Sequence, residues 1–352
     1  MKYGKIRVED GSLLFTKHMV LNSLPCKDIV WAYMRRESED ENEGRQMIAN
    51  YLMVLTKRKK RYKFDMSEKE AQDCIRLLRV LNPEMAVGFP KGGRVHLQSL
   101  PNTRDLGALS ARDGRHILPR KLLRSGDLYH LSIADKELFA DEYHLKTVID
   151  FRSPKEREAR PDTIMAGVEY YHIPILDEET VGISRDRENL DKLFCTPGGA
   201  EEFMKRQYEY IIRDQYSVKQ YARFIDVLLR HKDGAVLWHC SSGKDRSGIG
   251  TVLLLSILGI PKDVIREDYM RSNRYLEGEL RYMERLLEAT SGGEDTTEKK
   301  EKLRAFFQVR EEYIDIIYRT IDMEYGSMEK FQKKALYLTP KAIGDLRDKY
   351  LL

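Results

Sequence analysis

A nucleophile and an anion-binding side chain stand close together in the segment WHCSSGKDRSG, residues 238–248. Cys240 follows a short apolar stretch, and Arg246 comes six residues later, shortly before a long apolar run. A cysteine thiolate is a nucleophile, and the planar guanidinium of arginine binds two phosphate oxygens at once. The spacing therefore predicts phosphoryl transfer to Cys240, with Arg246 binding the phosphate.

The residues between these two suit a loop that encloses an anion. The N–H groups at the start of a helix carry partial positive charge, which favours both a bound phosphate and a thiolate. Gly243 lets the backbone turn tightly, and Lys244 adds a positive charge unless it points outward into solvent. We expect the phosphate to contact Ser241, Ser242, Gly243, Lys244, Arg246 and Ser247. The Ser247 hydroxyl is also expected to donate to the cysteine sulfur.

Three further polar residues stand beside this loop or at the end of a predicted strand. Asp150 and Arg152 follow an apolar stretch. They either orient the loop or form an internal ion pair without a role in turnover. His239 directly precedes the cysteine, and we expect it to orient the loop and favour the thiolate rather than act as a base.

The elements that must position these residues follow an α/β pattern. From about residue 95, apolar strands alternate with helices, which predicts a mainly parallel central sheet flanked by helices. Strands are expected at 147–151, 170–176 and 235–238, and helices over 202–230, 251–258, 299–323 and from Thr339 to the C-terminus. The strand at 235–238 places Cys240 at its carboxyl end. The long charged connection 177–220 is either a helical lid over the site or a rigid surface insertion.

Residues 1–89 follow a different pattern. Short apolar runs between turn signals predict strands at 13–15, 19–24, 29–34, 52–55 and 62–66. The capping box of Ser67 and Glu70 then begins an amphipathic helix that Pro83 ends. This order resembles a pleckstrin-homology-like (PH-like) domain, with residues 90–94 as a linker to the part from 95 to 352.

Two charged runs occur in this N-terminal part. The acidic residues 37–44 are predicted to form a solvated loop between strands. The basic residues 57–61 are predicted at a hairpin turn, where they either meet anionic lipid headgroups or form a solvated turn that protects a sheet edge.

Composition excludes several other classes. The net charge of +4 over 352 residues is small for a nucleic-acid-binding protein. We expect neither a signal peptide nor a membrane span, because the N-terminus has no apolar segment and no apolar run is long enough. The four cysteines contain no CxxC pair, which favours a reducing cytoplasm over a disulfide framework. No metal or cofactor is expected, since the eight histidines form no HxH or HExxH pattern.

Several segments together resemble one known family. Residues 239–248, HCSSGKDRSG, resemble the HC-x2-GKDR-[ST]-G loop of bacterial tyrosine phosphatases that also act on phosphoinositides. The other similar segments are 102–107 (N-x-RDLG), 148–153 with Glu156 and Pro161 (DLRS…E…P) and 268–273 (DY-x2-SN). The likeness extends from about residue 95 to the C-terminus. Departures from the family pattern at Thr103, Phe151 and Ser247 remove no catalytic group.

The resemblance implies a cysteine-dependent, metal-free mechanism in which Asp245 is the general acid and later the base. Two alternatives stay open. Asp245 is a structural carboxylate if it only pairs with a neighbouring arginine. Asp177, which follows the predicted strand at 170–176, is the rival acid, because strand ends in α/β sheets face the active-site crevice.

We therefore expect a phosphomonoester hydrolase that acts on phosphotyrosine in proteins. The first alternative is a phosphoinositide phosphatase whose N-terminal domain is a membrane adaptor, which Lys244 and the basic run favour. In that case an anionic membrane or a protein contacts the N-terminal domain. The second alternative is a module that binds phosphorylated ligands without turnover. Sulfur transfer, as in rhodanese-like proteins, matches the GKDRSG sequence poorly.

Overall fold

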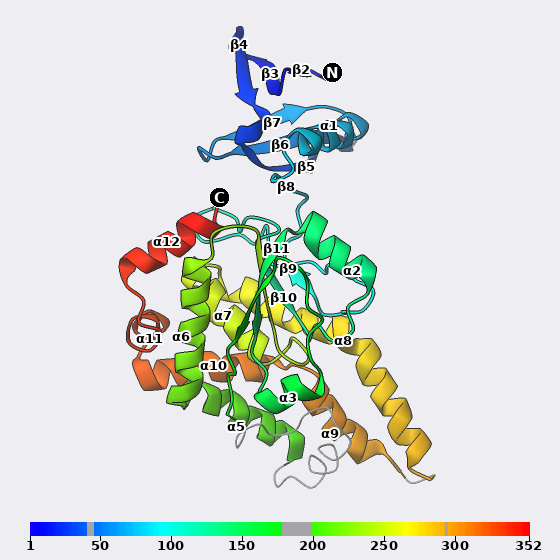
Figure 1. Cartoon of the computed structure of the whole chain (residues 1–352), viewed down its shortest axis with the longest axis vertical. Helices are drawn as coiled ribbons and strands as arrows, with labels where there is room; N and C mark the ends of the chain where they lie inside the picture. Colours follow the sequence, from blue (N-terminus) through cyan, green and yellow to red (C-terminus); the bar gives the residue numbers. More distant parts are fainter. Residues whose placement is uncertain (41–45, 178–198, 293–294) are drawn as a thin grey trace. The chain divides into compact units, whose positions relative to one another are not determined.

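The computed structural model describes residues 1–40, 46–177, 199–292 and 295–352 (Figure 1). The chain divides into two compact units. Unit 1 comprises Met1–Lys91 with residues 117–119 and 352, and unit 2 comprises Gly92–His116 and Arg120–Leu351. Each unit is described by itself below. In the described part of the chain, no helix has the length and apolarity needed to cross a lipid bilayer.

Unit 1 contains two four-stranded sheets and one helix. The first sheet is antiparallel throughout and consists of β1 (Lys2–Tyr3), β2 (Ile6–Glu9), β3 (Ser12–Lys17) and β4 (Val20–Pro25). The second consists of β5 (Ile29–Asp40), β6 (Gln46–Thr56), β7 (Arg61–Asp65) and β8 (Ala86–Val87), with β8 parallel to β5. Helix α1 (Glu68–Leu81) packs on β5 and β6 through Cys74 and Leu78, which are fully buried.

The predicted strands of unit 1 are present, and so is the capping box. The Ser67 hydroxyl accepts from the Glu70 N–H, and the Glu70 carboxylate accepts from the Ser67 N–H. The short strands β1, β2 and β8 were not predicted. The acidic run was predicted wrongly in part, because residues 37–40 continue β5. Glu37 fits a strand there since it pairs with Arg35 and Lys63, at 2.9 and 2.6 Å. Residues 41–45 lie outside the described part.

Unit 2 has the predicted mixed α/β organisation. Its five-stranded sheet has the order β12-β11-β13-β10-β9, with parallel pairing except between β9 and β10. The strands are β9 (Arg104–Asp105), β10 (Leu122–Ser125), β11 (Leu145–Asp150), β12 (Glu169–His172) and β13 (Ala235–His239). His239 is opposite Ser125 on β10 and Asp150 on β11. The carboxyl ends of the three inner strands therefore meet at one edge, directly before Cys240.

Helices surround this sheet (Figure 1). They are α2 (Ile133–Glu137), η2 (Leu138–Glu142), α3 (Pro154–Ala159), α5 (Gly199–Arg213), α6 (Gln215–Arg230), α7 (Arg246–Leu258), α8 (Lys262–Thr290), α9 (Thr297–Phe307), α10 (Glu311–Tyr325), α11 (Met328–Lys334) and α12 (Pro340–Tyr350). Helix α7 packs on β10 and β13 and also contacts α6, α8 and α12. Because it is covered on all sides, nearly all its residues are buried, which explains its apolar sequence.

Several boundaries differ from those predicted. Helix α7 begins at Arg246 rather than at residue 251, and the predicted helix at 299–323 is two helices, α9 and α10. Strand β12 ends at His172 rather than at Leu176, because Pro174 has no N–H to donate. Ile173 and Ile175 still donate to the carbonyls of Asp150 and Phe151. Helix α11 was not predicted, whereas Thr339 caps α12 as expected.

Candidate active site

Cys240 lies at the carboxyl end of the central strand β13 and is almost completely buried. The carbonyl of Ser241 accepts from the Asp127 N–H at 3.1 Å, that of Ser242 from Asn102 Nδ2 at 2.9 Å, and that of Gly243 from Arg124 Nη2 at 2.8 Å. A trans peptide unit points its N–H opposite to its carbonyl. With these carbonyls bonded to the outside, the N–H groups of the loop turn toward its interior, where an anion would lie.

Gly243 is required by the path of this loop. Its φ is +71°, a backbone conformation that side chains with a Cβ rarely adopt. A Cβ at this position would lie 2.4 Å from the carbonyl carbon and oxygen of Ser125. The loop is thus packed directly against the end of β10.

Arg246, the first residue of α7, is held by Glu156 from α3. Nη1 and Nη2 donate to the two carboxylate oxygens at 2.6 and 2.7 Å, and Nη2 also lies 3.2 Å from Ser241 Oγ. Burial alone would raise the pKa of Glu156, but the charge of Arg246 outweighs it and holds that pKa well below its usual range. The fork of Arg246 is therefore held in one orientation by Glu156 and Ser241.

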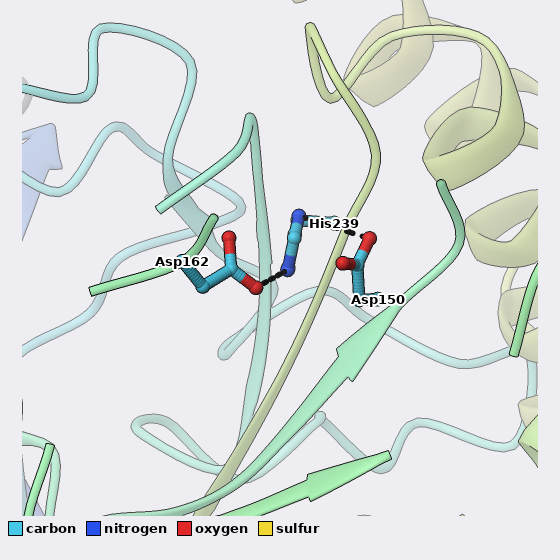
Figure 2. Close-up of side chains that lie close together, drawn as sticks. All are labelled: Asp150, Asp162 and His239. Atoms are coloured by element: carbon cyan, nitrogen blue, oxygen red, sulfur yellow. Dashed lines mark hydrogen bonds and ion pairs between the residues drawn. The ribbon is translucent and has the colours of Figure 1, made fainter. Parts of the chain in front are cut away.

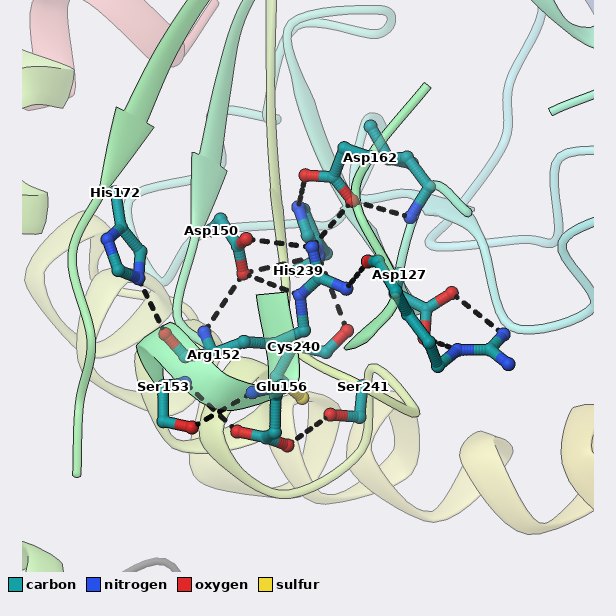
Figure 3. A network of polar contacts seen from close by, with 12 residues as sticks. Asp127, Asp150, Arg152, Ser153, Glu156, Asp162, His172, His239, Cys240 and Ser241 are labelled. Carbon is teal, nitrogen blue, oxygen red and sulfur yellow. Dashed lines mark hydrogen bonds and ion pairs between the residues drawn. The ribbon is translucent and has the colours of Figure 1, made fainter. Parts of the chain in front are cut away.

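Glu156 is a site residue that the sequence predicted only as part of a motif, without a role. Its backbone N–H and carboxylate form a capping box with Ser153, which fixes the start of α3. Figure 3 shows Glu156 and Ser241 facing each other close to Cys240, with the Ser241 hydroxyl donating to Glu156 at 2.5 Å. The S-x-x-E pattern at 153–156 was the available signal, the same one that identified the box at 67–70.

Asp245 and Lys244 contact each other beside the loop. Lys244 Nζ lies 2.6 Å from Asp245 Oδ2, and Tyr208 from α5 donates to Asp245 Oδ1 at 2.7 Å. Lys244 is only 3% exposed, which does not match the outward-pointing alternative. Asp245 keeps a quarter of its side chain exposed and pairs with a lysine rather than an arginine. A carboxylate in this place can exchange protons with a group bound in the loop.

A buried carboxylate, Asp268, is connected to the loop through Arg124. Asp268 on α8 pairs with Arg104 at 3.0 Å and with Arg124 at 2.8 Å, and all three side chains are at most 1% exposed. Burial alone would raise the pKa of Asp268, but the two arginines lower it. Arg124 also donates to the Gly243 carbonyl, so this cluster reaches the loop backbone.

His239, the residue before Cys240, lies between the carboxylates of Asp150 and Asp162 (Figure 2). Nε2 is 2.9 Å from Asp162 Oδ2, and Nδ1 is 3.8 Å from Asp150 Oδ1 and 3.3 Å from the Cys240 carbonyl. Burial alone would lower the pKa of His239, but Asp150 and Asp162 raise it to about 9. The imidazole is therefore positively charged at neutral pH. Its charge lies on the residue next to Cys240 in the chain.

Arg152 completes this network (Figure 3). It donates to both oxygens of Asp150, at 2.9 and 2.8 Å, and to Asp162 at 2.8 Å. The ligand atoms of Asp150, Asp162 and His239 lie within 4.8 Å of one another, a spacing that a metal ion can use. Two cationic side chains already neutralise the two carboxylates here, so we assign the cluster as an ion-pair network. Asp162 had no predicted role.

Asp177 and Ser247 were also predicted as site residues. Asp177 is exposed and borders residues 178–198, which lie outside the described part, so nearly half of the predicted lid at 177–220 is not described. The remaining lid residues, 199–220, belong to α5 and α6. Ser247 Oγ is buried without a hydrogen-bond partner among the described residues, so it does not donate to the Cys240 sulfur here.

Comparisons with known proteins match the two parts of the chain separately. Residues 95–352 match the tyrosine phosphatase family, and residues 2–93 match a family described as a domain of unknown function (DUF6709).

Three relatives are similar to the chain. A protein of Cupriavidus necator named as a tyrosine-protein phosphatase is 29% identical over 72% of this chain and 86% of its own length. A tyrosine-protein phosphatase of Nostoc commune is 31% identical over 45% of this chain and 50% of its own. The triple specificity protein phosphatase PtpB of Mycobacterium tuberculosis is 27% identical over 62% of this chain and 86% of its own.

Proposed function

The chain belongs to the tyrosine phosphatase family, and from that premise we propose that it hydrolyses phosphotyrosine in proteins through a phosphocysteine on Cys240. The observation that supports this most is the orientation of Arg246 by Glu156, with both Nη atoms held beside the loop. An oriented guanidinium together with inward N–H groups suits a phosphate dianion.

In the first step the Cys240 thiolate attacks phosphorus. The S–P bond forms, the P–O bond to tyrosine breaks, and its electron pair goes to the phenolic oxygen. Asp245 gives that oxygen a proton. Arg246 and the loop N–H groups stabilise the negative charge on the three other phosphate oxygens in the transition state.

In the second step a water molecule attacks the phosphocysteine. Asp245, now a carboxylate, takes a proton from the water, and the S–P bond breaks with its electron pair returning to sulfur. Inorganic phosphate then leaves. Ser247 is buried and has no partner among the described residues. We assign its hydroxyl to the departing sulfur, toward which it turns in this step.

A phosphoinositide is the second candidate substrate. The buried ammonium of Lys244 beside the loop favours it, because a second cation suits a substrate with more than one phosphate. One relative carries the name triple specificity phosphatase, which is consistent with a broad substrate range. In this version residues 1–89 form a PH-like domain, joined by a linker at 90–94 to a catalytic domain at 95–352. The exposed turn at 57–60 then meets anionic lipid at the cytoplasmic face of a membrane.

The test is steady-state hydrolysis of a phosphotyrosine peptide and a panel of phosphoinositides in the presence of a chelator. We expect Cys240→Ser to abolish turnover and Asp245→Asn to lower it about 10²-fold or more, with Asp177→Asn near wild type. Lys244→Met is expected to impair phosphoinositide turnover more than peptide turnover if lipids are the substrate. Tight binding without any turnover would leave a phosphate-binding module, and a large loss only in Asp177→Asn would make Asp177 the acid.

A further inference from the structure

Asp245 occupies the N-cap position of α7, yet its side chain does not cap the helix. An aspartate at this position usually accepts a hydrogen bond from an N–H of the first turn. Here its two oxygens have other partners: Oδ1 accepts from Tyr208, and Oδ2 pairs with Lys244. The carboxylate is thus turned away from its own helix and held in place by side chains.

We infer, resting on the function proposed above, that Tyr208 is the positioning residue of the general acid. Its hydroxyl fixes Oδ1 of Asp245, so that Oδ2 is the oxygen that carries the proton to the leaving group. The two oxygens of one carboxylate then have separate tasks. Tyr208 itself neither gives up nor receives a proton in the reaction.

The packing around Tyr208 gives its hydroxyl a fixed position. The side chain is fully buried on α5, and its hydroxyl is also 2.7 Å from that of Tyr269 on α8. The rings of Tyr208 and Tyr269 meet edge to face, with centroids 6.4 Å apart. Tyr208 also packs against Tyr313 of α10, with ring centroids 5.3 Å apart. Three helices therefore hold this donor, and its reach to Oδ1 does not depend on a flexible side chain.

Tyr208 also stays protonated, as a permanent donor must. Burial, with a further contribution from the Asp245 charge, raises the pKa of Tyr208 well above its ordinary value. Because the same holds for Tyr269, the two hydroxyls form a short neutral chain that ends at Asp245. This chain can stabilise a carboxylate but cannot supply the proton that the leaving oxygen takes.

Lys244 is the second side chain that holds the Asp245 carboxylate. Its Nζ lies 2.6 Å from Oδ2 of Asp245 and 5.6 Å from the ring centroid of Phe306 on α9. A phosphate dianion bound in the loop offers this ammonium more charge than Asp245 does. When Lys244 turns to the phosphate, Oδ2 becomes free to carry a proton, while the bond from Tyr208 keeps the carboxyl in place.

The test uses leaving-group dependence in the full-length protein. Phenyl phosphate releases a weakly acidic phenol that needs a proton, whereas para-nitrophenyl phosphate releases an anion that leaves unaided. The parameter is kcat/KM, since it reports the steps up to phenol release. We expect Tyr208→Phe to lower kcat/KM about tenfold or more for phenyl phosphate and at most about twofold for the nitrophenyl ester. Tyr350→Phe is the matched control, because its buried hydroxyl donates to the Leu228 carbonyl instead.

A double variant distinguishes positioning from general structural support. In an Asp245→Asn background, Tyr208→Phe should cause no further loss on phenyl phosphate, because both changes remove the same function. Equal losses on the two esters, no loss at all, or additive losses in the double variant would overturn the role of Tyr208. If Asp245→Asn alone leaves the ratio of the kcat/KM values for the two esters unchanged, Asp245 is not the general acid and the proposed mechanism is wrong.

If Tyr208→Phe does not fold, Tyr269→Phe provides a second test of the role of Tyr208. It removes only the outer hydroxyl of the chain, so Tyr208 retains its bond to Asp245. We expect a smaller loss in the same direction, about two- to fivefold and confined to phenyl phosphate. A loss shared by both esters would count against the inference. Thermal unfolding of each variant shows whether it is folded.

Discussion

Glu156 and Arg246 form a two-point contact that joins α3 to the start of α7. Both carboxylate oxygens accept from the guanidinium, at 2.6 and 2.7 Å, and each side chain is nearly buried. The contact leaves the remaining donors of Arg246 for a ligand in the loop. Under the proposed function, a guanidinium with a fixed orientation loses less conformational freedom when phosphate binds, and this strengthens that binding.

Replacing Glu156 should therefore weaken phosphate binding and catalysis together. In Glu156→Gln the amide keeps the size of the side chain but has no charge and a single acceptor oxygen. We expect kcat/KM for phenyl phosphate to fall about tenfold or more and competitive inhibition by inorganic phosphate to weaken. Glu158→Gln on the same helix is the control, because Glu158 is exposed. Equal inhibition constants in wild type and Glu156→Gln would contradict this role.

Gly243→Ala should disrupt the loop through both backbone strain and collision. The positive φ alone costs about 1 kcal/mol or more, and the added Cβ would lie 2.4 Å from Ser125. We expect loss of turnover and a lower midpoint of urea unfolding. Gly114→Ala separates the two causes, because Gly114 also has a positive φ, +81°, but nothing lies within 4 Å of the added Cβ. If both variants retain equal activity, the loop does not need the close packing on β10.

The sequence predicted the local features of the site well. Neighbouring residues predict three features: a buried strand that ends in cysteine, a turn at glycine and an apolar helix. All three are present around Cys240. The same holds for the capping box of Ser67 and Glu70. Such features depend on short-range periodicity and on hydrogen bonds within one turn, which residue types alone indicate.

The contacts that orient the site could not be predicted in this way. Arg246 pairs with a residue ninety positions earlier in the chain, and Asp245 bonds to Tyr208 on a different helix. No periodicity in one sequence records which side chains meet across a fold. The role of Asp162 was missed for the same reason, since it lies in the connection between α3 and β12 and its partner His239 lies at the end of β13.

Asp268→Asn should destabilise unit 2 strongly. The change would leave Arg104 and Arg124, which are both fully buried, without their shared counter-charge. Removing one partner from a buried ion pair typically costs about 3–5 kcal/mol of unfolding free energy. Urea unfolding measures the loss, and Glu267→Gln is the control, because Glu267, which pairs with Arg271 on the same helix, has a largely exposed side chain. A loss no larger than that of the control would show that the arginines find other partners.

Stability should also depend on pH through His239. Its pKa is raised to about 9 in the folded protein, against about 6.5 in the unfolded chain. The folded state therefore binds this proton more tightly, so the stabilisation is complete below about pH 6.5 and is lost as the pH rises through about 9. The difference corresponds to roughly 3 kcal/mol. We expect the free energy of unfolding, measured in urea from pH 6 to 10, to decline across this interval.

Asp162→Asn tests the cause of that decline. Without the Asp162 carboxylate beside Nε2, only Asp150 raises the pKa of His239 against the effect of burial, so that pKa should fall. The free energy of unfolding should then depend less steeply on pH. The variant is expected to be less stable than wild type at pH 6 and closer to it at pH 10. His96→Gln removes an exposed histidine and should leave the slope unchanged. A slope in Asp162→Asn as steep as that of wild type would assign the decline to another titrating group.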